Sequence, residues 1–209
     1  MKRIFSLLLA LLLLALLPPA ARAEDLAVES RACLLMEKTT GQVLYAVNEH
    51  EQLEPASVTK IMTLLLVMEA IDAGTLGYDD TVTASAYACS MGGSQIWLKE
   101  NEQMTVHDLL KAVCVASAND ASVALAEHIA GSAEAFVEKM NQRAKELGMN
   151  DTTFRNPTGL PADGHVTSAY DIAVMSRELI LHHPDIRQFT TIWMDSLRNG
   201  EFGLNNTNK

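Results

Sequence analysis

Residues 55–60 read Pro-Ala-Ser-Val-Thr-Lys, and apolar residues then return at helical spacing until Gly74. This pattern predicts a helix whose first turn carries Ser57, with Lys60 one turn later on the same face. Residues three apart on a helix have Cβ atoms about 5–6 Å apart, so the Lys60 amine can take the proton of the Ser57 hydroxyl. The positive end of the helix dipole favours a developing alkoxide and disfavours a protonated lysine. The ordinary alternative is a capping serine and a solvated lysine. The apolar residues of the pattern are Ile61, Leu64, Leu65, Met68 and Ile71.

A second polar motif, Ser117-Ala118-Asn119, separates two apolar helical runs at residues 106–115 and 121–130. A short connection of this kind is held by both helices and can direct its polar side chains into a cleft. By itself, Ser-x-Asn is equally compatible with an ordinary turn between helices. Its meaning therefore depends on the rest of the chain.

The order of the two motifs, with Ser-x-Asn about 60 residues after Ser-x-x-Lys, resembles that of penicillin-binding proteins and related β-lactamases. Further segments are similar to the low-molecular-mass serine D-alanyl-D-alanine carboxypeptidases, and this likeness runs from about Ala32 to Lys209. Within that family the chain resembles the exported enzymes of spore-forming and related Gram-positive bacteria. The segments that carry the likeness are Gly92-Gly93-Ser94-Gln95, residues 118–126, Leu147-Gly148-Met149, Asn156-Pro157-Thr158-Gly159-Leu160 and Thr167-Ser168-Ala169-Tyr170-Asp171.

The resemblance implies an acyl-transfer reaction and a role for each motif residue. Ser57 would attack the carbonyl between two terminal D-alanines of a peptidoglycan stem peptide, and water would hydrolyse the resulting ester. The backbone N–H of Ser57 would form one half of the oxyanion hole. Ser117 would relay a proton to the leaving nitrogen, and Asn119 would hydrogen-bond the substrate backbone. β-Lactam antibiotics would acylate the same serine, and no cofactor or metal is implied.

Lys60 has to be neutral to act as the base, whereas the reference pKa of lysine is about 10.4. Lowering this pKa to about 7 corresponds to roughly 4–5 kcal/mol, which burial together with nearby positive potential can supply. Lys60 can therefore act as the base only if its surroundings disfavour the charged form.

The family's third motif, Lys-Thr-Gly on an edge strand, does not follow Ser117 in this sequence. The segment Lys38-Thr39-Thr40-Gly41 has an inserted threonine and precedes Ser57, so it does not correspond to that motif. Asn206-Thr207-Asn208-Lys209 resembles the segment shortly upstream of it. By resemblance, we expect the motif, the last three strands of a sheet of about five, a C-terminal β domain and an amphipathic membrane anchor to lie beyond Lys209. We accordingly expect the 209-residue chain alone to be impaired.

Two other functions compete with the carboxypeptidase. A class A β-lactamase needs a general-base glutamate after Ser-x-Asn, for which Glu146 with Asn150 is the nearest candidate. Glu146 also fits the solvated last turn of a helix, and Ala118 stands where such lactamases usually carry aspartate. The second alternative is a non-catalytic module that binds penicillin or wall peptides. A long-lived penicillin adduct indicates the carboxypeptidase, fast turnover the lactamase, and no adduct the binding module.

Residues 1–23 have the pattern of a secretory signal peptide. Lys2-Arg3 precede an apolar run of 14 residues from Ile4 to Leu17, and Ala21-Arg22-Ala23 forms a small-x-small cleavage site. A membrane anchor is the alternative, but this run is short for a span that needs about 20 residues. We therefore expect export to the cell wall or the outer face of the cytoplasmic membrane, with residues 24–209 forming one catalytic domain.

The charge balance is acidic. The formal net charge is −10, and it becomes about −13 once Lys2, Arg3 and Arg22 are removed with the signal peptide. This balance argues against nucleic acid as a partner and against electrostatic docking on an anionic membrane.

The cysteines and histidines give no sign of a metal site. Cys33 lies in a strand-like run and Cys114 on an apolar helical face, so both are interpreted as small core residues. With Cys89 they make three cysteines, and the pattern does not indicate which pair an oxidising compartment would join. The six histidines show no metal-ligand spacing, and His182-His183 before Pro184 is typical of a helix C-terminus.

The remaining pattern predicts a β-hairpin followed by a largely helical subdomain. This is an α/β arrangement of the α+β type and, by resemblance, a β-lactamase/transpeptidase-like fold. Residues 32–36 and 42–47 form the arms of the hairpin, and further helices are expected at 106–115, 120–130, 133–147 and 169–182. Thr105 and Ser168 are the expected N-caps. Since a stable sheet normally needs three or more strands, we expect the antiparallel sheet to be incomplete in this chain.

Overall fold

The computed structural model describes residues 28–206. Every element described below belongs to the unit Arg31–Lys209. The signal peptide predicted at residues 1–23 lies outside the described residues. No helix in the described part of the chain is both long and apolar enough to cross a membrane.

The four helices predicted after residue 105 are confirmed to within one residue at each end. They are α4 (Val106–Ala116), α5 (Asn119–Ala130), α6 (Ala133–Glu146) and α7 (Ala169–His182). Two predicted caps form, because the Thr105 hydroxyl accepts the N–H of Asp108 at 3.1 Å and the Ser168 hydroxyl accepts that of Asp171 at 3.2 Å. Local capping chemistry therefore sets where these helices begin.

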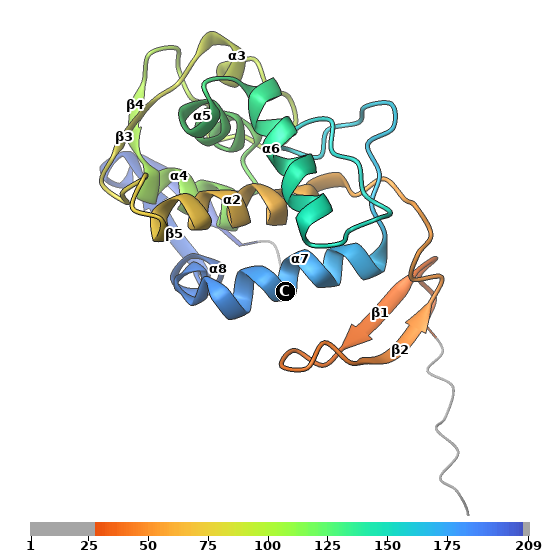
Figure 1. Cartoon of the computed structure of the whole chain (residues 1–209). Coiled ribbons are helices and arrows are strands. Elements are labelled where there is room, and N and C mark those ends of the chain that lie inside the picture. The colour runs from red at the N-terminus through yellow and green to blue at the C-terminus, as the bar shows by residue number, and fades with distance from the viewer. Residues whose placement is uncertain (1–27, 207–209) are drawn as a thin grey trace, which may run out of the picture. The chain divides into compact units, whose positions relative to one another are not determined.

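The helix that carries Lys60 is α2 (Lys60–Asp72), and a 3-10 turn, Ala56–Thr59, leads into it. Figure 1 shows α2 running between α6 and α7, and it also contacts α5. The apolar residues of the predicted pattern are not the only buried ones in α2, because Met62 and Val67, which lie outside that pattern, are fully buried as well. A helix that is covered on several sides has no need of a single apolar face.

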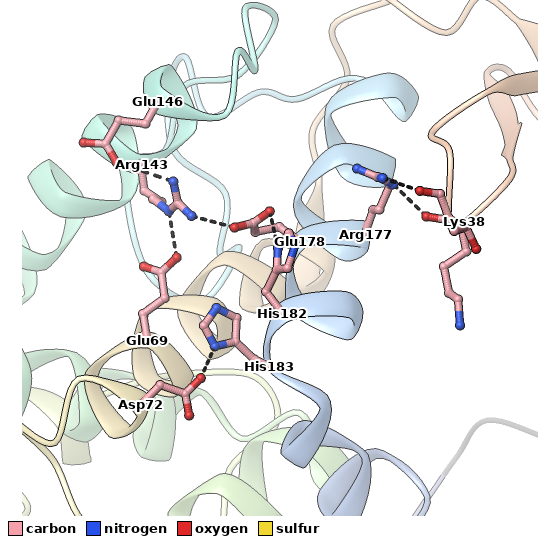
Figure 2. Close-up of polar contacts among 10 residues, drawn as sticks. Lys38, Glu69, Asp72, Arg143, Glu146, Arg177, Glu178, His182 and His183 are labelled. Atoms are coloured by element: carbon pink, nitrogen blue, oxygen red, sulfur yellow. Dashed lines mark hydrogen bonds and ion pairs between the residues drawn. The ribbon is translucent and has the colours of Figure 1, made fainter.

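The predicted hairpin is confirmed as the antiparallel strands β1 (Cys33–Met36) and β2 (Val43–Val47). Its turn is organised by Glu37, whose carboxylate accepts the backbone N–H groups of Thr39 and Thr40 at 2.9 and 2.5 Å. The hydroxyl of Thr40, followed by these N–H groups, lowers the Glu37 pKa to about 2. β1 lies against α7, from which Arg177 donates to the carbonyl oxygens of Lys38 and Thr39, both at 2.7 Å (Figure 2).

Two small sheets were not predicted. One pairs β3 (Thr81–Thr83) with β4 (Gln103–Thr105), and the other pairs β5 (Met194–Leu197) with β6 (Phe202–Asn205). Each sheet within residues 28–206 has two strands. The short helices are α3 (Ala86–Cys89) and α8 (Arg187–Thr190), with 3-10 turns at Pro184–Ile186 and Arg198–Gly200.

A polar cluster joins three of the long helices (Figure 2). Arg143 of α6 donates to Glu69 of α2 at 2.7 Å and to Glu178 of α7 at 2.8 Å. Just after α7, the Nδ1 atom of His183 lies 2.5 Å from the carboxylate of Asp72 at the end of α2. These contacts hold α2 from the end opposite Ser57.

Part of this cluster has the composition of a metal site. Glu69, Glu178 and His183 each offer a ligand atom, and the three atoms lie within 4.8 Å of one another. Both carboxylates, however, already accept hydrogen bonds from Arg143. His183 in turn contacts Asp72, so these groups form an ion-pair network.

The three cysteines are free thiols and all are partly buried. Cys114 packs against the main core, as predicted, and burial raises the pKa of its thiol to about 12. Cys33 is half-buried in β1 rather than a full core residue. The high pKa makes Cys114 a poor nucleophile, since the thiolate is the reactive form.

Candidate active site

Ser57 lies in the 3-10 turn that precedes α2, not in the first turn of the α-helix itself. Its side chain is exposed, whereas Thr59 and Lys60 on the other side of the turn are buried. Ala56, directly before Ser57, has a left-handed backbone with φ of 46°. Such a conformation is rare for a residue other than glycine and persists only where the surroundings hold it.

Lys60 is buried, with 4% of its surface exposed. Its Nζ atom lies 3.2 Å from Ser57 Oγ and donates to the carbonyl oxygen of Thr158 at 2.7 Å. Burial lowers the pKa of Lys60 to about 8, and no carboxylate within residues 28–206 forms an ion pair with it. The amine therefore has a neutral fraction near pH 7 and lies within reach of the serine hydroxyl.

The Thr158 carbonyl is held in place by the loop at residues 156–160. In the sequence this loop stands out only as one of the segments that carry the family resemblance. The Oδ1 atom of Asn156 accepts the backbone N–H groups of Thr158 and Gly159 at 3.1 and 2.7 Å, and its Nδ2 atom donates to Leu160 O at 2.8 Å. The loop also docks on α2, where the Thr63 hydroxyl donates to Pro157 O at 2.7 Å. Asn-Pro-x-Gly is a turn signal, but its partner on α2 is not visible in the sequence.

Gly159 brings this loop against the backbone next to Ser57. Its φ is +84°, and a Cβ atom at this position would lie 1.7 Å from Ala56 O and 3.0 Å from Ser57 N. No side chain fits there. A cavity of about 170 Å³ adjoins this contact, between Glu54–Ala56 and Gly159–Ala162.

His165 supports the same turn from within the protein. The Arg155 N–H donates to His165 Nδ1 at 2.9 Å, so Nδ1 carries no proton and Nε2 donates to Thr59 Oγ1 at 2.8 Å. Burial, followed by the charge of Arg155, lowers the pKa of His165. No residue near His165 in the chain singles it out, because its partner Thr59 lies 106 residues away.

The second polar motif, Ser117–Asn119, connects α4 to α5. Ser117 ends α4 in a left-handed conformation with φ of 54° and is half-buried, and Asn119 begins α5 with 5% of its surface exposed. Asn119 Nδ2 donates to Gly92 O and its backbone N–H to Ser94 O, both at 2.7 Å. Its Oδ1 atom is buried and has no hydrogen-bond partner.

The structure thus brings Ser57 and Lys60 into direct contact, and it directs Asn119 towards the loop at residues 92–94. Among the described residues, neither Ser117 nor Asn119 hydrogen-bonds to Lys60 through its side chain. An unpaired amide oxygen in a buried position is costly unless a ligand supplies a donor. Asn119 Oδ1 thus lacks a hydrogen-bond partner among the described residues.

Glu146, considered as a lactamase base, lies away from this group. It is the last residue of α6, about half exposed, and its carboxylate contacts Arg143 at 3.5 Å and Gln142 at 2.8 Å. This is the solvated helix end considered as its alternative interpretation. No contact links it to Ser57 or Lys60 in the part of the chain that the structure describes.

A protein-family model described as D-alanyl-D-alanine carboxypeptidase, peptidase family S11, matches residues 19–209. The chain belongs to this family. It is 50% identical to the D-alanyl-D-alanine carboxypeptidase DacF of Bacillus subtilis, an alignment that covers 100% of this chain and 56% of the relative. The structures of family members are also similar. Penicillin-binding protein 6B from Escherichia coli superposes with a TM-score of 0.83 at 38% identity, covering 91% of this chain and 61% of that protein.

A second similar structure is penicillin-binding protein D2 from Listeria monocytogenes in its ampicillin-bound form. Its TM-score is 0.73 at 30% identity, over 89% of this chain and 75% of that protein. These S11 neighbours confirm the predicted α+β, transpeptidase-like fold. The chain spans about half the length of the curated relatives it matches, for example 56% of DacF.

Proposed function

We propose that this S11 chain is the catalytic part of a serine-type D-Ala-D-Ala carboxypeptidase, which removes the terminal D-alanine from peptidoglycan stem peptides. The contact between Ser57 and Lys60 carries the proposal, because the two side chains meet at 3.2 Å and burial lowers the lysine pKa to about 8. At pH 7 this pKa leaves about a tenth of the lysine neutral. A nucleophile beside a partly neutral amine is the arrangement that acyl transfer requires.

In the first half of the reaction, Ser57 Oγ attacks the carbonyl carbon between the two D-alanines while its proton passes to Lys60 Nζ. The negative oxygen of the tetrahedral intermediate is bound by the backbone N–H of Ser57. As the C–N bond breaks, the leaving nitrogen takes a proton that returns from Lys60 through Ser117. In the second half, water attacks the ester, the acid product leaves and the Ser57 hydroxyl is restored.

Asn119 binds the substrate backbone in this proposal. The amide group of Asn119 is oriented by Gly92 O, which accepts from Nδ2, so Oδ1 is left to accept a peptide N–H of the substrate. The Lys60 amine is oriented in the same manner by Thr158 O. Both catalytic and binding groups are thus held before a substrate arrives, which reduces the entropy lost on binding.

β-Lactams are the second class of ligand that we propose for Ser57, since the Listeria relative is known in an ampicillin-bound form. We further propose that residues 1–23 direct export and that residues 24–209 form one extracytoplasmic catalytic domain. Peptidoglycan lies outside the cytoplasmic membrane, so the proposed signal peptide and substrate agree. Of the competing functions, a class A β-lactamase is disfavoured by the position of Glu146 on α6.

The experiment that tests this function is labelling of the full-length protein with a fluorescent penicillin. We expect a stable adduct on the peptide that contains Ser57, no adduct in Ser57→Ala, and full labelling in the control Ser30→Ala, an exposed serine near the start of the described residues. In parallel, release of D-alanine from a peptide that ends in D-Ala-D-Ala should disappear in Ser57→Ala. Labelling that survives this substitution would contradict the assignment. Rapid loss of the adduct would favour the lactamase, and its absence the binding module.

A further inference from the structure

The segment Ile96–Leu98 lies between α3 and β4 and has an unusual backbone. Trp97, at its centre, has a left-handed conformation with φ of 58°, and 67% of its surface is exposed. A bulky residue in this conformation is an outlier that the surrounding structure has to hold. Two side chains of opposite charge hold this segment. Asp120 accepts from its N–H groups, and Arg198 donates to its carbonyl groups.

Asp120 holds the N–H groups. It is the second residue of α5 and is fully buried, and its carboxylate accepts from Leu98 N at 3.0 Å, from Ala121 N at 2.9 Å and from Ile96 N at 3.2 Å. No cation forms an ion pair with Asp120 in residues 28–206, so backbone N–H groups are what satisfy its charge. Its place at the N-terminus of α5 adds a favourable interaction with the helix dipole.

Arg198 holds the carbonyl groups from the turn between β5 and β6. Its Nη1 atom donates to Ile96 O at 2.9 Å and its Nη2 atom to Trp97 O at 3.4 Å. The Nε and Nη2 atoms of Arg198 also donate to the Glu102 carboxylate, at 2.6 and 3.1 Å. The segment is therefore fastened on both edges by side chains from distant parts of the chain.

The same loop determines how Asn119 is presented. Gly92 O and Ser94 O, just before the fastened segment, accept the side-chain and backbone N–H groups of Asn119 at 2.7 Å each. A Cβ atom on Gly93 would lie 2.9 Å from Asn119 Nδ2, so the loop packs directly against the amide. Asn119 and Asp120 are neighbours in α5, and the loop is bonded to both.

We propose that Asp120 is a positioning residue for substrate binding. By fixing Ile96 and Leu98 it holds the loop at residues 92–98 against α5, and the loop then orients Asn119 through Gly92 O and Ser94 O. Arg198 completes the fastening from the carbonyl side. The inference rests on the proposed function for its catalytic readout, but the fastening of the loop can be measured without any activity.

The first test measures the loop in the 209-residue chain, which contains two tryptophans, Trp97 and Trp193. In a Trp193→Phe background, Trp97 is the sole tryptophan. The substitution Asp120→Asn then replaces one carboxylate oxygen, which accepts a backbone N–H, with an NH₂ group that cannot accept it. We expect a shift of Trp97 emission and loss of hydrogen-exchange protection at the Ile96 and Leu98 amides. The control Asp79→Asn, an exposed residue with the same charge change, should alter neither. Unchanged protection and emission in Asp120→Asn would overturn the proposal.

The second test separates binding from chemistry in the full-length protein. Because Asn119 contacts substrate whereas Ser57 and Lys60 react with it, Asp120→Asn should weaken the initial binding of penicillin about tenfold or more. The first-order acylation step should stay within a few-fold of wild type. A loss confined to the acylation step would contradict the positioning role.

A second variant, at Arg198, tests the same loop if Asp120→Asn does not fold. Arg198→Met releases only the carbonyl side of the segment, and we expect a smaller change of the same kind in Trp97 emission and in penicillin binding. No change in either quantity would count against the fastened loop. If wild-type protein binds no penicillin at all, the proposed function fails, while the fluorescence and exchange measurements still decide the role of Asp120.

Discussion

Gly159 lies so close to Ala56 that a Cβ atom on it would stand 1.7 Å from the Ala56 carbonyl oxygen. This contact presses the loop at residues 156–160 onto the backbone that carries Ser57, 102 positions earlier in the chain. The Ser57 N–H, proposed as an oxyanion donor, is in the same contact. The shape of the active site therefore depends on the absence of a side chain at residue 159.

Gly159→Ala should impair acylation far more than it impairs folding. The added methyl group has to displace the Ala56–Ser57 backbone, and a displacement of about 1 Å in an active site can reduce the rate by about 10²-fold. Gly131→Ala is the matched control, because its φ is also +84° but nothing lies within 4 Å of its Cβ position. We expect Gly131→Ala to lose about 1 kcal/mol of stability and no acylation rate. Equal acylation rates in the two variants would contradict the role of this contact.

Acylation by penicillin should increase with pH up to about 8 and level off above it, because the reactive form of Lys60 is neutral and its pKa is about 8. Below that pKa the rate should fall about tenfold per pH unit. Lys60→Arg keeps the positive charge but does not deprotonate in this range, so acylation should fall by orders of magnitude while the fold persists. An arginine variant that acylates within a few-fold of wild type would show that Lys60 is not the base.

Lys60 should also lower the stability of the protein. Its pKa falls from 10.5 to about 8 on folding, so the unfolded state binds more protons between these values and stability rises with pH across that window. Below pH 8 the full penalty is present, and it corresponds to roughly 3 kcal/mol. Lys60→Met removes this penalty but leaves Thr158 O without its donor. We therefore expect the variant to be about 1–2 kcal/mol more stable than wild type in urea unfolding at pH 7. Its stability should not increase with pH above 8.

Lys111→Met is the control for this gain. Lys111 is also buried, but it pairs with Asp108 at 3.1 Å and with Asp195 at 3.2 Å. Its removal leaves two carboxylates without their cation, so the variant should be destabilised. If both methionine variants change stability in the same direction, burial of the Lys60 charge is not what limits stability at pH 7.

His165 should make the protein less stable in acid. Its pKa is lowered on folding from 6.5, so above 6.5 both states are neutral, and as the pH falls below 6.5 the unfolded state takes up the proton first. Arg155 and Glu54 are the charged groups that act on this histidine, and desolvation is the larger effect. His165→Gln can still donate to Thr59 but does not titrate. We expect the loss of unfolding free energy between pH 7.5 and 5 to be smaller in this variant than in wild type or in the exposed control His128→Gln.

Arg143 pairs with glutamates of α2 and α7, so its removal should lower the free energy of unfolding. Arg143→Met leaves Glu69 and Glu178, both only partly exposed, facing each other without a cation. Because solvent screens the pair in part, we expect a loss of about 2–3 kcal/mol in urea unfolding at pH 7. Adding Glu69→Gln and Glu178→Gln to this variant should restore much of the loss. If the triple variant is no more stable than Arg143→Met, repulsion between the carboxylates is not the cause.

Some features of the protein follow from residues that are close together in the sequence. The hairpin at residues 33–47, the caps at Thr105 and Ser168, and the spacing of Ser57 and Lys60 all depend on contacts between near neighbours. Hydrogen bonds of this kind form in one or two turns of chain, so the residue types alone predict them. The family resemblance rests on the same local motifs.

Other features depend on tertiary contacts between residues that are far apart in the chain. Lys60 is buried by the loop of Thr158, Asn119 is oriented by Gly92 and Ser94, and α2 is covered on several sides. The periodicity of α2 gave no warning of this burial, because it records one helix and not its neighbours. A pKa, an orphaned amide oxygen and the fit of Gly159 against Ala56 arise only when distant segments exclude water from one another. The sequence by itself therefore determined which residues could react, and the tertiary structure decided how they are held and how easily they titrate.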